Sequence, residues 1–202
     1  MLRTEYYEEL KLLARQTRAR FGLDSPRVLR SDLRRIYKEE GIKIDLWPYK
    51  PRRLRGAYFD DDLGATVMLA KGLPEDPMVF TMGHELKHHL VDRGLSLSYC
   101  DASNQSNPME IGAEIFAAEL IYPDEDFRDH LIQMGVSQGS CRPEILVRLK
   151  RETRTTLSYA GLAKRAEFMG FASRGAMAKI RWKKLEEELY GPPVYKRFRN
   201  RS

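Results

Sequence analysis

Apolar and polar positions near the start of the chain alternate with the period of an α-helix. Over residues 4–20 one face carries four regularly spaced side chains: Tyr6, Leu10, Leu13 and Thr17. A second helix is predicted over residues 25–40, because Ser25 followed by Pro26 is a typical helix start and Gly41 a typical stop. Two helices are therefore expected before the first strand.

The pattern then changes to that of β-strands. Residues 42–47 alternate apolar and polar side chains, as a half-buried strand does. Residues 56–59 and 65–69 form a hairpin pattern around the turn 60–64, which is rich in aspartate and ends in glycine. We therefore expect a small antiparallel sheet.

Helical patterns dominate the rest of the chain. One helix begins near Pro74 and runs to about residue 92, and a polar loop over residues 94–107 separates it from another helix at 108–121. Pro123 ends that helix and begins a further one. One small sheet with flanking helices predicts an α+β fold.

Composition narrows the class of protein. The chain has 202 residues, 42% hydrophobic and 32% charged, which is too apolar for a disordered chain and too charged for a membrane protein. No stretch approaches the ~18 uninterrupted apolar residues of a membrane span, and the first residues lack the apolar core of a signal peptide. Cys100 and Cys141 cannot form a disulfide framework and are expected as free thiols. We therefore expect a cytoplasmic protein without a membrane partner.

The net charge of +6 conceals an uneven distribution. Residues 57–130 carry a net charge of −11, whereas residues 1–56, 131–180 and 181–202 carry +7, +6 and +4. The acidic segment also holds all four histidines: His84, His88, His89 and His130. Carboxylates and imidazoles in one segment are typical of a cation site. The basic flanks fit a weak contact with DNA or an ordinary solvated surface, and charge alone does not choose between these.

The predicted helix before residue 92 contains the motif H-E-x-x-H. His84 and His88 lie one turn apart on one face, so both imidazoles can reach one metal ion. Glu85 lies beside them, where it can take a proton from water and pass it to a leaving amine. Two apolar stripes predict that this helix is buried nearly all round: Met82, Leu86 and Leu90 on one side, and Phe80 and Val91 with the histidines on the other. His89 is one step off the ligand face and is expected to be an ordinary, partly exposed histidine.

A third ligand is needed to complete a metal site. The metzincin extension requires glycine at 91 and histidine at 94, but the chain has Val91 and Gly94. The next candidates lie on one face of the helix at 108–121: Glu110, Ala113, Glu114 and Ala117. Alanines on that face let this helix approach the histidine helix closely. We expect Glu110 as ligand and Glu114 as a group that orients a ligand histidine; the reverse assignment and a solvated face remain alternatives.

Two motifs together resemble the ImmA/IrrE metallopeptidase family, which has H-E-L-G-H followed by E-x-x-A-N-x-F-A-x-x-L-L-M-P. The matching residues are His84, Glu85, Leu86 and His88, and then Glu110, Ala113, Phe116, Ala117, Leu120 and Pro123. The resemblance covers roughly residues 30–135. It implies a zincin-like (gluzincin-type) metallopeptidase domain in which His84, His88 and Glu110 bind zinc and Glu85 is the catalytic acid and base.

The chain departs from the family pattern at three positions. Lys87 replaces the usual glycine, Glu114 the usual asparagine, and Tyr122 the methionine before the proline. We expect Lys87 to offset part of the charge that Glu114 adds. Several members of the family cut a helix-turn-helix repressor and so derepress genes in stress or mobile-element responses. The resemblance therefore implies a zinc endopeptidase whose partner is such a repressor.

The organisation expected from the sequence is a metallopeptidase domain at residues 1–135, a helical segment at 136–190 and a basic tail at 191–202. Two basic helices, at 158–169 and 173–189, resemble a helix-turn-helix in outline. An alternative function is therefore a DNA-binding or adaptor protein with a regulatory, non-catalytic metal site. Candidate oxyanion donors are not ranked by the sequence: Tyr99, Tyr122 and His130.

Overall fold

The chain forms an α+β structure that divides into two compact units. The computed structural model describes residues 3–48, 55–93, 98–99 and 107–193. Within these residues there are eight α-helices and four β-strands, as the predicted class requires. The first unit comprises Met1–Pro123 and Thr155–Leu157, and the second Asp124–Arg154 and Ser158–Ser202. The functional division at residues 135 and 190 stays a prediction, and residues 194–202 of the predicted tail lie outside the described residues.

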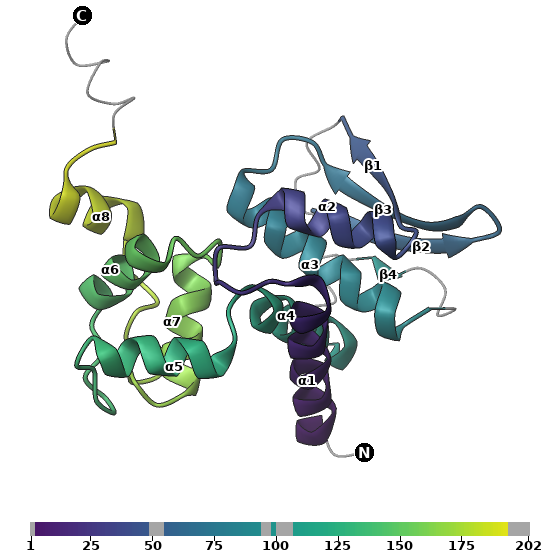
Figure 1. Cartoon of the computed structure of the whole chain (residues 1–202). Coiled ribbons are helices and arrows are strands. Elements are labelled where there is room, and N and C mark those ends of the chain that lie inside the picture. Colours follow the sequence, from purple (N-terminus) through teal and green to yellow (C-terminus); the bar gives the residue numbers. More distant parts are fainter. Residues whose placement is uncertain (1–2, 49–54, 94–97, 100–106, 194–202) are drawn as a thin grey trace, which may run out of the picture. The chain divides into compact units, whose positions relative to one another are not determined.

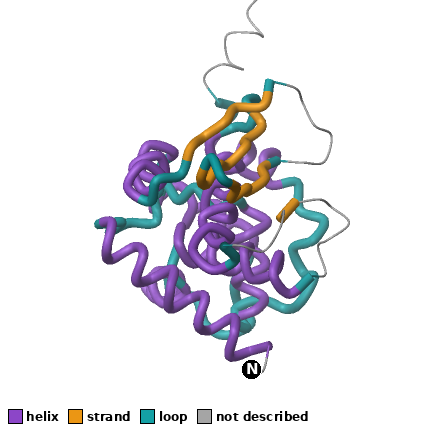
Figure 2. The backbone as a smooth tube through the Cα atoms, turned by 90° about the vertical axis from the view of Figure 1, so that its right-hand side faces the viewer, coloured by secondary structure: helices purple, strands orange, loops and turns teal. Residues whose placement is uncertain are grey.

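The sheet of the first unit is mixed rather than antiparallel. Its strands are β1 (Lys43–Trp47), β2 (Gly56–Asp61), β3 (Gly64–Ala70) and β4 (Ser98–Tyr99), in the order β1-β3-β2-β4 (Figure 1). Figure 2 shows the strands in orange. The predicted hairpin of β2 and β3 is confirmed, but β1 pairs with β3 in parallel. The antiparallel prediction is wrong for this pair because the second strand of the hairpin, rather than the first, lies beside β1. Alternation identifies a strand but not its neighbour.

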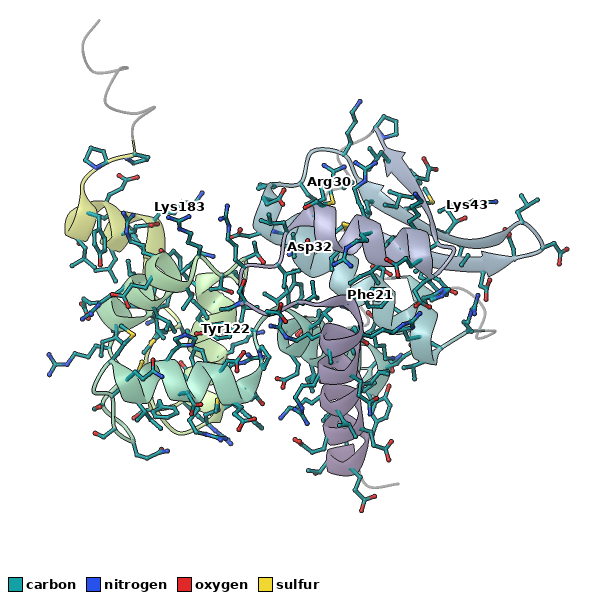
Figure 3. The ribbon with its side chains drawn as sticks, viewed as in Figure 1. Phe21, Arg30, Asp32, Lys43, Tyr122 and Lys183 are labelled. Carbon is teal, nitrogen blue, oxygen red and sulfur yellow. The ribbon has the colours of Figure 1, made fainter. Side chains whose placement is uncertain are left out.

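The first helix begins where the sequence predicted, whereas the second begins later than predicted. Helix α1 (Arg3–Phe21) confirms the first, whereas α2 (Arg30–Glu39) begins later than expected. The Ser25 hydroxyl accepts a hydrogen bond from the Arg27 amide and closes a local turn instead of capping a helix. The helix start is stabilised by Asp32, whose carboxylate accepts a 2.8 Å hydrogen bond from the Leu29 amide (Figure 3).

Helices α3 (Glu75–Val91) and α4 (Pro108–Ile121) confirm the two helices on which the motifs were placed. The start of α4 follows local rules, since Asn107 accepts a hydrogen bond from the Met109 amide and proline takes the first helical position. Helix α3 is enclosed by α2, α4 and the strands β2 and β3, and its residues 81–89 are all buried. The prediction of a helix buried nearly all round is confirmed, although Val91 at its end is 41% exposed.

Small residues bring α3 and α4 close together. A Cβ atom placed on Gly83 would lie 3.3 Å from the Cβ of Ala117, which is tighter than ordinary van der Waals contact. The side chains of Ala113 and Ala117 are fully buried. The expected close approach of the two helices is therefore confirmed.

Replacing Ala117 with leucine should force the two helices apart. We expect Ala117→Leu to lower the free energy of unfolding by about 1–3 kcal/mol, because the added carbons have no space beside Gly83. Thermal denaturation of the metal-free protein measures this change. The matched control is Ala178→Leu, at an exposed alanine. Equal stability of the two variants would show that the contact tolerates a larger residue.

Helix α1 covers α4 in the first unit (Figure 1). Arg18 donates hydrogen bonds from Nη1 to the carbonyl oxygens of Leu120 and Ile121, at 2.7 and 3.2 Å, and so satisfies backbone groups at the end of α4. Arg15 forms a 2.8 Å ion pair with the buried Glu119. These contacts fix α4 from the side of α1.

The described residues of the second unit form four helices, and one predicted helix is confirmed only in part. They are α5 (Asp124–Gln133), α6 (Pro143–Thr153), α7 (Tyr159–Phe168) and α8 (Trp182–Tyr190). Helix α7 matches the predicted one at 158–169, but the helix expected at 173–189 forms only from Trp182 onward, as α8. Residues 174–179 form turns, and Gly175 has a positive φ of 74°, which a continuous helix does not allow. The described residues therefore lack the predicted short-turn pairing of these two helices.

Two further expectations concern thiols and membranes. Cys141 is a free, buried thiol, and burial raises its pKa to about 11; Cys100 lies outside the described residues. None of the helices in the described part of the chain combines the length and the apolar character that a membrane span requires.

Candidate metal centre

Three side chains from two helices of the first unit converge on one point. Helix α3 supplies His84 and His88, and α4 supplies Glu110. Nε2 of His84 lies 3.3 Å from Nε2 of His88 and 3.2 Å from Oε2 of Glu110. Nε2 of His88 lies 3.6 Å from Oε1 of Glu110. The sequence placed these residues on two helices, and the structure brings their donor atoms together.

The donor set fits a zinc ion. Two imidazole nitrogens and one carboxylate oxygen are typical zinc ligands, and donors placed tetrahedrally at 2.0–2.1 Å from one ion lie about 3.3 Å apart. The three observed separations, 3.2, 3.3 and 3.6 Å, are close to this spacing. The side chains of His84 and Glu110 keep only 11% and 12% of their surface exposed, and that of His88 none. The three donors are therefore close together and shielded, and a tetrahedral zinc ion held by them would need one further ligand.

Negative charge surrounds the histidines. Burial alone lowers the pKa of His84, but the hydrogen bond to Glu110 and the charges of Glu85, Glu110 and Glu114 outweigh burial and raise it. Glu114 is exposed, one turn beyond Glu110, and does not belong to the three-residue cluster found among the described residues. The electrostatic field of these carboxylates therefore favours a cation at the site. The roles of Glu110 as ligand and of Glu114 as orienting group stay predictions.

Glu85 is fully buried between α3 and β2. A Cβ atom placed on Gly56, the first residue of β2, would lie 2.8 Å from Oε1 of Glu85 and 2.5 Å from Cγ2 of Thr81. The backbone of β2 thus passes directly beside this carboxylate, and only glycine allows the approach. The strand restricts where the carboxylate can lie, a restriction that sequence patterns did not predict.

Asp92 is a site residue that sequence reasoning missed. Its Oδ2 accepts a 2.7 Å hydrogen bond from Nδ1 of His88 and a 2.5 Å hydrogen bond from Nζ of Lys87. Burial raises the pKa of Asp92, but the hydrogen bonds from His88 and Lys87 outweigh burial and lower it. The sequence offered one signal, the four-residue spacing from His88, because Asp92 directly follows α3 and so lies one helical turn beyond His88. Lys87 forms its ion pair with Asp92, and the expected offset of the Glu114 charge stays a prediction.

His89 is buried, with 2% of its surface exposed, so its predicted partial exposure is wrong. Its Nδ1 contacts the hydroxyl of Tyr58 at 3.1 Å, and its Nε2 lies 4.0 Å from Oε2 of Glu40. These partners come from β2 and from the residue that follows α2, which both cover this side of α3. The helix face beyond the two clustered histidines is therefore part of the core.

The candidate oxyanion donors remain unranked. The side chain of Tyr99 lies outside the described residues. Tyr122 is fully buried at the end of α4 (Figure 3). His130 belongs to α5 in the second unit, where Nδ1 donates a 2.7 Å hydrogen bond to the backbone oxygen of Asp126.

Comparison with known families covers both helices of the site. The family model Peptidase_M78, described as the IrrE N-terminal-like domain, matches residues 37–161, more than half of the chain. This span contains β1, the hairpin, α3 and α4, and with them the three clustered residues and Glu85. A search of the curated proteins finds no match to the chain.

Proposed function

The chain belongs to the Peptidase_M78 family, and from this membership we propose that it is a zinc-dependent endopeptidase with a zincin-like (gluzincin-type) catalytic domain. Membership confirms the family resemblance and implies peptidase activity. The observation that carries the metal-dependent mechanism is the convergence of His84, His88 and Glu110 at separations that suit one zinc ion.

The proposed roles follow from the donor atoms. His84, His88 and Glu110 hold the metal. When bound, zinc supplies a Lewis acid that acidifies water and polarises a peptide carbonyl. Glu85 would take a proton from the attacking water and then deliver it to the leaving amine. Its burial beside β2 supports this role, because a confined carboxylate is already oriented for proton transfer.

The substrate that we propose is a cytoplasmic helix-turn-helix repressor, cut so that its genes are derepressed. The support is the family membership together with the two motifs on α3 and α4. The alternative, a DNA-binding or adaptor protein with a non-catalytic metal, has weaker support, since a structural metal site has no use for a buried glutamate beside the first ligand.

Elemental mass spectrometry of the purified protein tests the metal. We expect about one zinc ion per chain and little in a His84→Ala control, because that variant lacks one of the three protein ligands of the site. Absence of metal after zinc is supplied would contradict the proposal and leave a DNA-binding or adaptor function that needs no metal.

Incubation with purified helix-turn-helix repressors tests the substrate. We expect defined fragments, and a chelator should abolish their formation. Cleavage of unfolded casein but of no repressor would retain the endopeptidase and reject the repressor.

A further inference from the structure

Lys87 is a fully buried lysine in the middle of the H-E-x-x-H motif. None of its side-chain surface is exposed, and lysine is almost never buried to this extent unless it is paired. Its neighbours in the motif, His84, Glu85 and His88, have roles in the proposed chemistry, whereas Lys87 has none there.

The ammonium group of Lys87 joins three helices of the first unit. Nζ donates hydrogen bonds to Oδ2 of Asp92, at 2.5 Å, and to the backbone oxygen of Met109, at 3.3 Å. It also lies 5.8 Å from the centre of the Tyr6 ring on α1. Met109 directly precedes Glu110 on α4. Lys87 therefore links the helix that carries the two histidines to the first turn of the helix that carries the carboxylate.

Asp92 connects Lys87 to His88. One oxygen, Oδ2, accepts hydrogen bonds from both Nζ of Lys87 and Nδ1 of His88. A carboxylate that accepts Nδ1–H of a histidine fixes the tautomer and the ring orientation, so the lone pair of Nε2 points to the metal position. Lys87 in turn holds the carboxylate in place from within the core.

We propose that Lys87 and Asp92 are positioning residues of the metal centre: Asp92 orients His88, and Lys87 fixes both Asp92 and the first turn of α4, where Glu110 lies. This inference rests on the proposed function, since it requires that the cluster binds a metal ion. It concerns how the site is preorganised, and it adds no ligand.

Charge and positioning predict opposite results when the lysine is removed. A cation near the site repels a divalent metal ion, so a lysine that acted through charge alone would weaken binding, and its removal would strengthen it. A positioning lysine holds two ligand-bearing helices in register, and its removal would weaken binding. Whether zinc affinity rises or falls when Lys87 is replaced therefore distinguishes a pure charge effect from a positioning role.

The test compares zinc affinities, measured by competition with a chromogenic chelator. We expect Lys87→Met, Asp92→Asn and the double variant each to bind zinc about 10–100-fold more weakly than the wild type. The double variant is included because Lys87→Met alone leaves a buried carboxylate without its cation, which endangers folding. The matched control is Lys71→Met/Asp62→Asn, at two exposed positions. Circular dichroism verifies that each variant is folded.

A second measurement reports geometry without activity. Replacement of zinc by Co²⁺ gives visible absorption bands that depend on ligand arrangement, and we expect these bands to change in the folded double variant but not in the control. Unchanged or tighter zinc binding by the double variant would overturn the positioning role while leaving the endopeptidase intact. A wild type that binds no metal would instead contradict the proposed function itself.

Discussion

Glu85→Gln will keep about one zinc ion per chain and lower the rate of peptide cleavage by about 10²–10⁴-fold. Glutamine has nearly the shape of glutamate, so the fully buried position beside Gly56 still accommodates it. The amide cannot take a proton from water, and so the general-base step is lost while His84, His88 and Glu110 remain. Metal analysis and a cleavage assay on the same preparation separate these two effects.

The matched control for this variant is Glu75→Gln. Glu75 belongs to the same helix, α3, but lies exposed in its first turn, where it accepts a hydrogen bond from the Arg30 amide. The control should cleave substrate at the wild-type rate. Full activity of Glu85→Gln would refute the catalytic role of Glu85, and loss of zinc from that variant would show that the residue supports the site rather than the chemistry.

The elements that carry the site were predictable because their signals are local. The start of α4 is determined by Asn107 and Pro108, and its end by Pro123, and each signal lies at the helix end that it determines. The one-turn spacing of His84 and His88 defines a ligand face whatever surrounds the helix. Glu110 could be paired with them because alanines on its helix face indicated a close approach, which the contact of Ala117 with Gly83 confirms.

What could not be predicted depends on contacts between distant segments. The parallel pairing of β1 with β3 depends on which strand of the hairpin lies beside β1. The burial of His89 requires Tyr58 from the strand β2. Likewise, no pattern around residue 56 indicates that its backbone will pass beside Glu85. Such features follow from packing, which a single sequence does not display.

The uneven charge of the chain has a structural explanation in the site. Glu85, Asp92, Glu110 and Glu114 all belong to the acidic segment 57–130, and each lies in or beside the cluster of histidines. A divalent cation would compensate such a concentration of carboxylates, and Lys87 pairs with Asp92 inside the core. The acidic segment was interpreted from composition as a cation site, and the geometry of His84, His88 and Glu110 supports that interpretation.

A substitution in the tight contact between Gly56 and Glu85 is the second change for which we expect a large loss of cleavage rate. Gly56→Ala should lower the cleavage rate by about 10²-fold, because a misplacement of about 1 Å in a catalytic group costs that much. The backbone of Gly56 does not have a positive φ, so alanine can adopt its conformation and the effect is purely steric. The new methyl group would meet Thr81 and Glu85 at 2.5 and 2.8 Å. Thr81 is buried and β-branched, which restricts its rotamers in a helix, so the displacement falls largely on Glu85 or on β2.

The matched control for this variant is Gly72→Ala, because a Cβ atom on Gly72 would meet nothing within 4 Å and its φ is also not positive. We expect the control to retain full activity. Gly56→Ala should still bind zinc, since the three proposed ligands lie outside the contacts of this methyl group, and steady-state kinetics should show the loss mainly in kcat. Wild-type kcat in folded Gly56→Ala would mean that β2 yields to the methyl group and that confinement by this strand does not position the carboxylate.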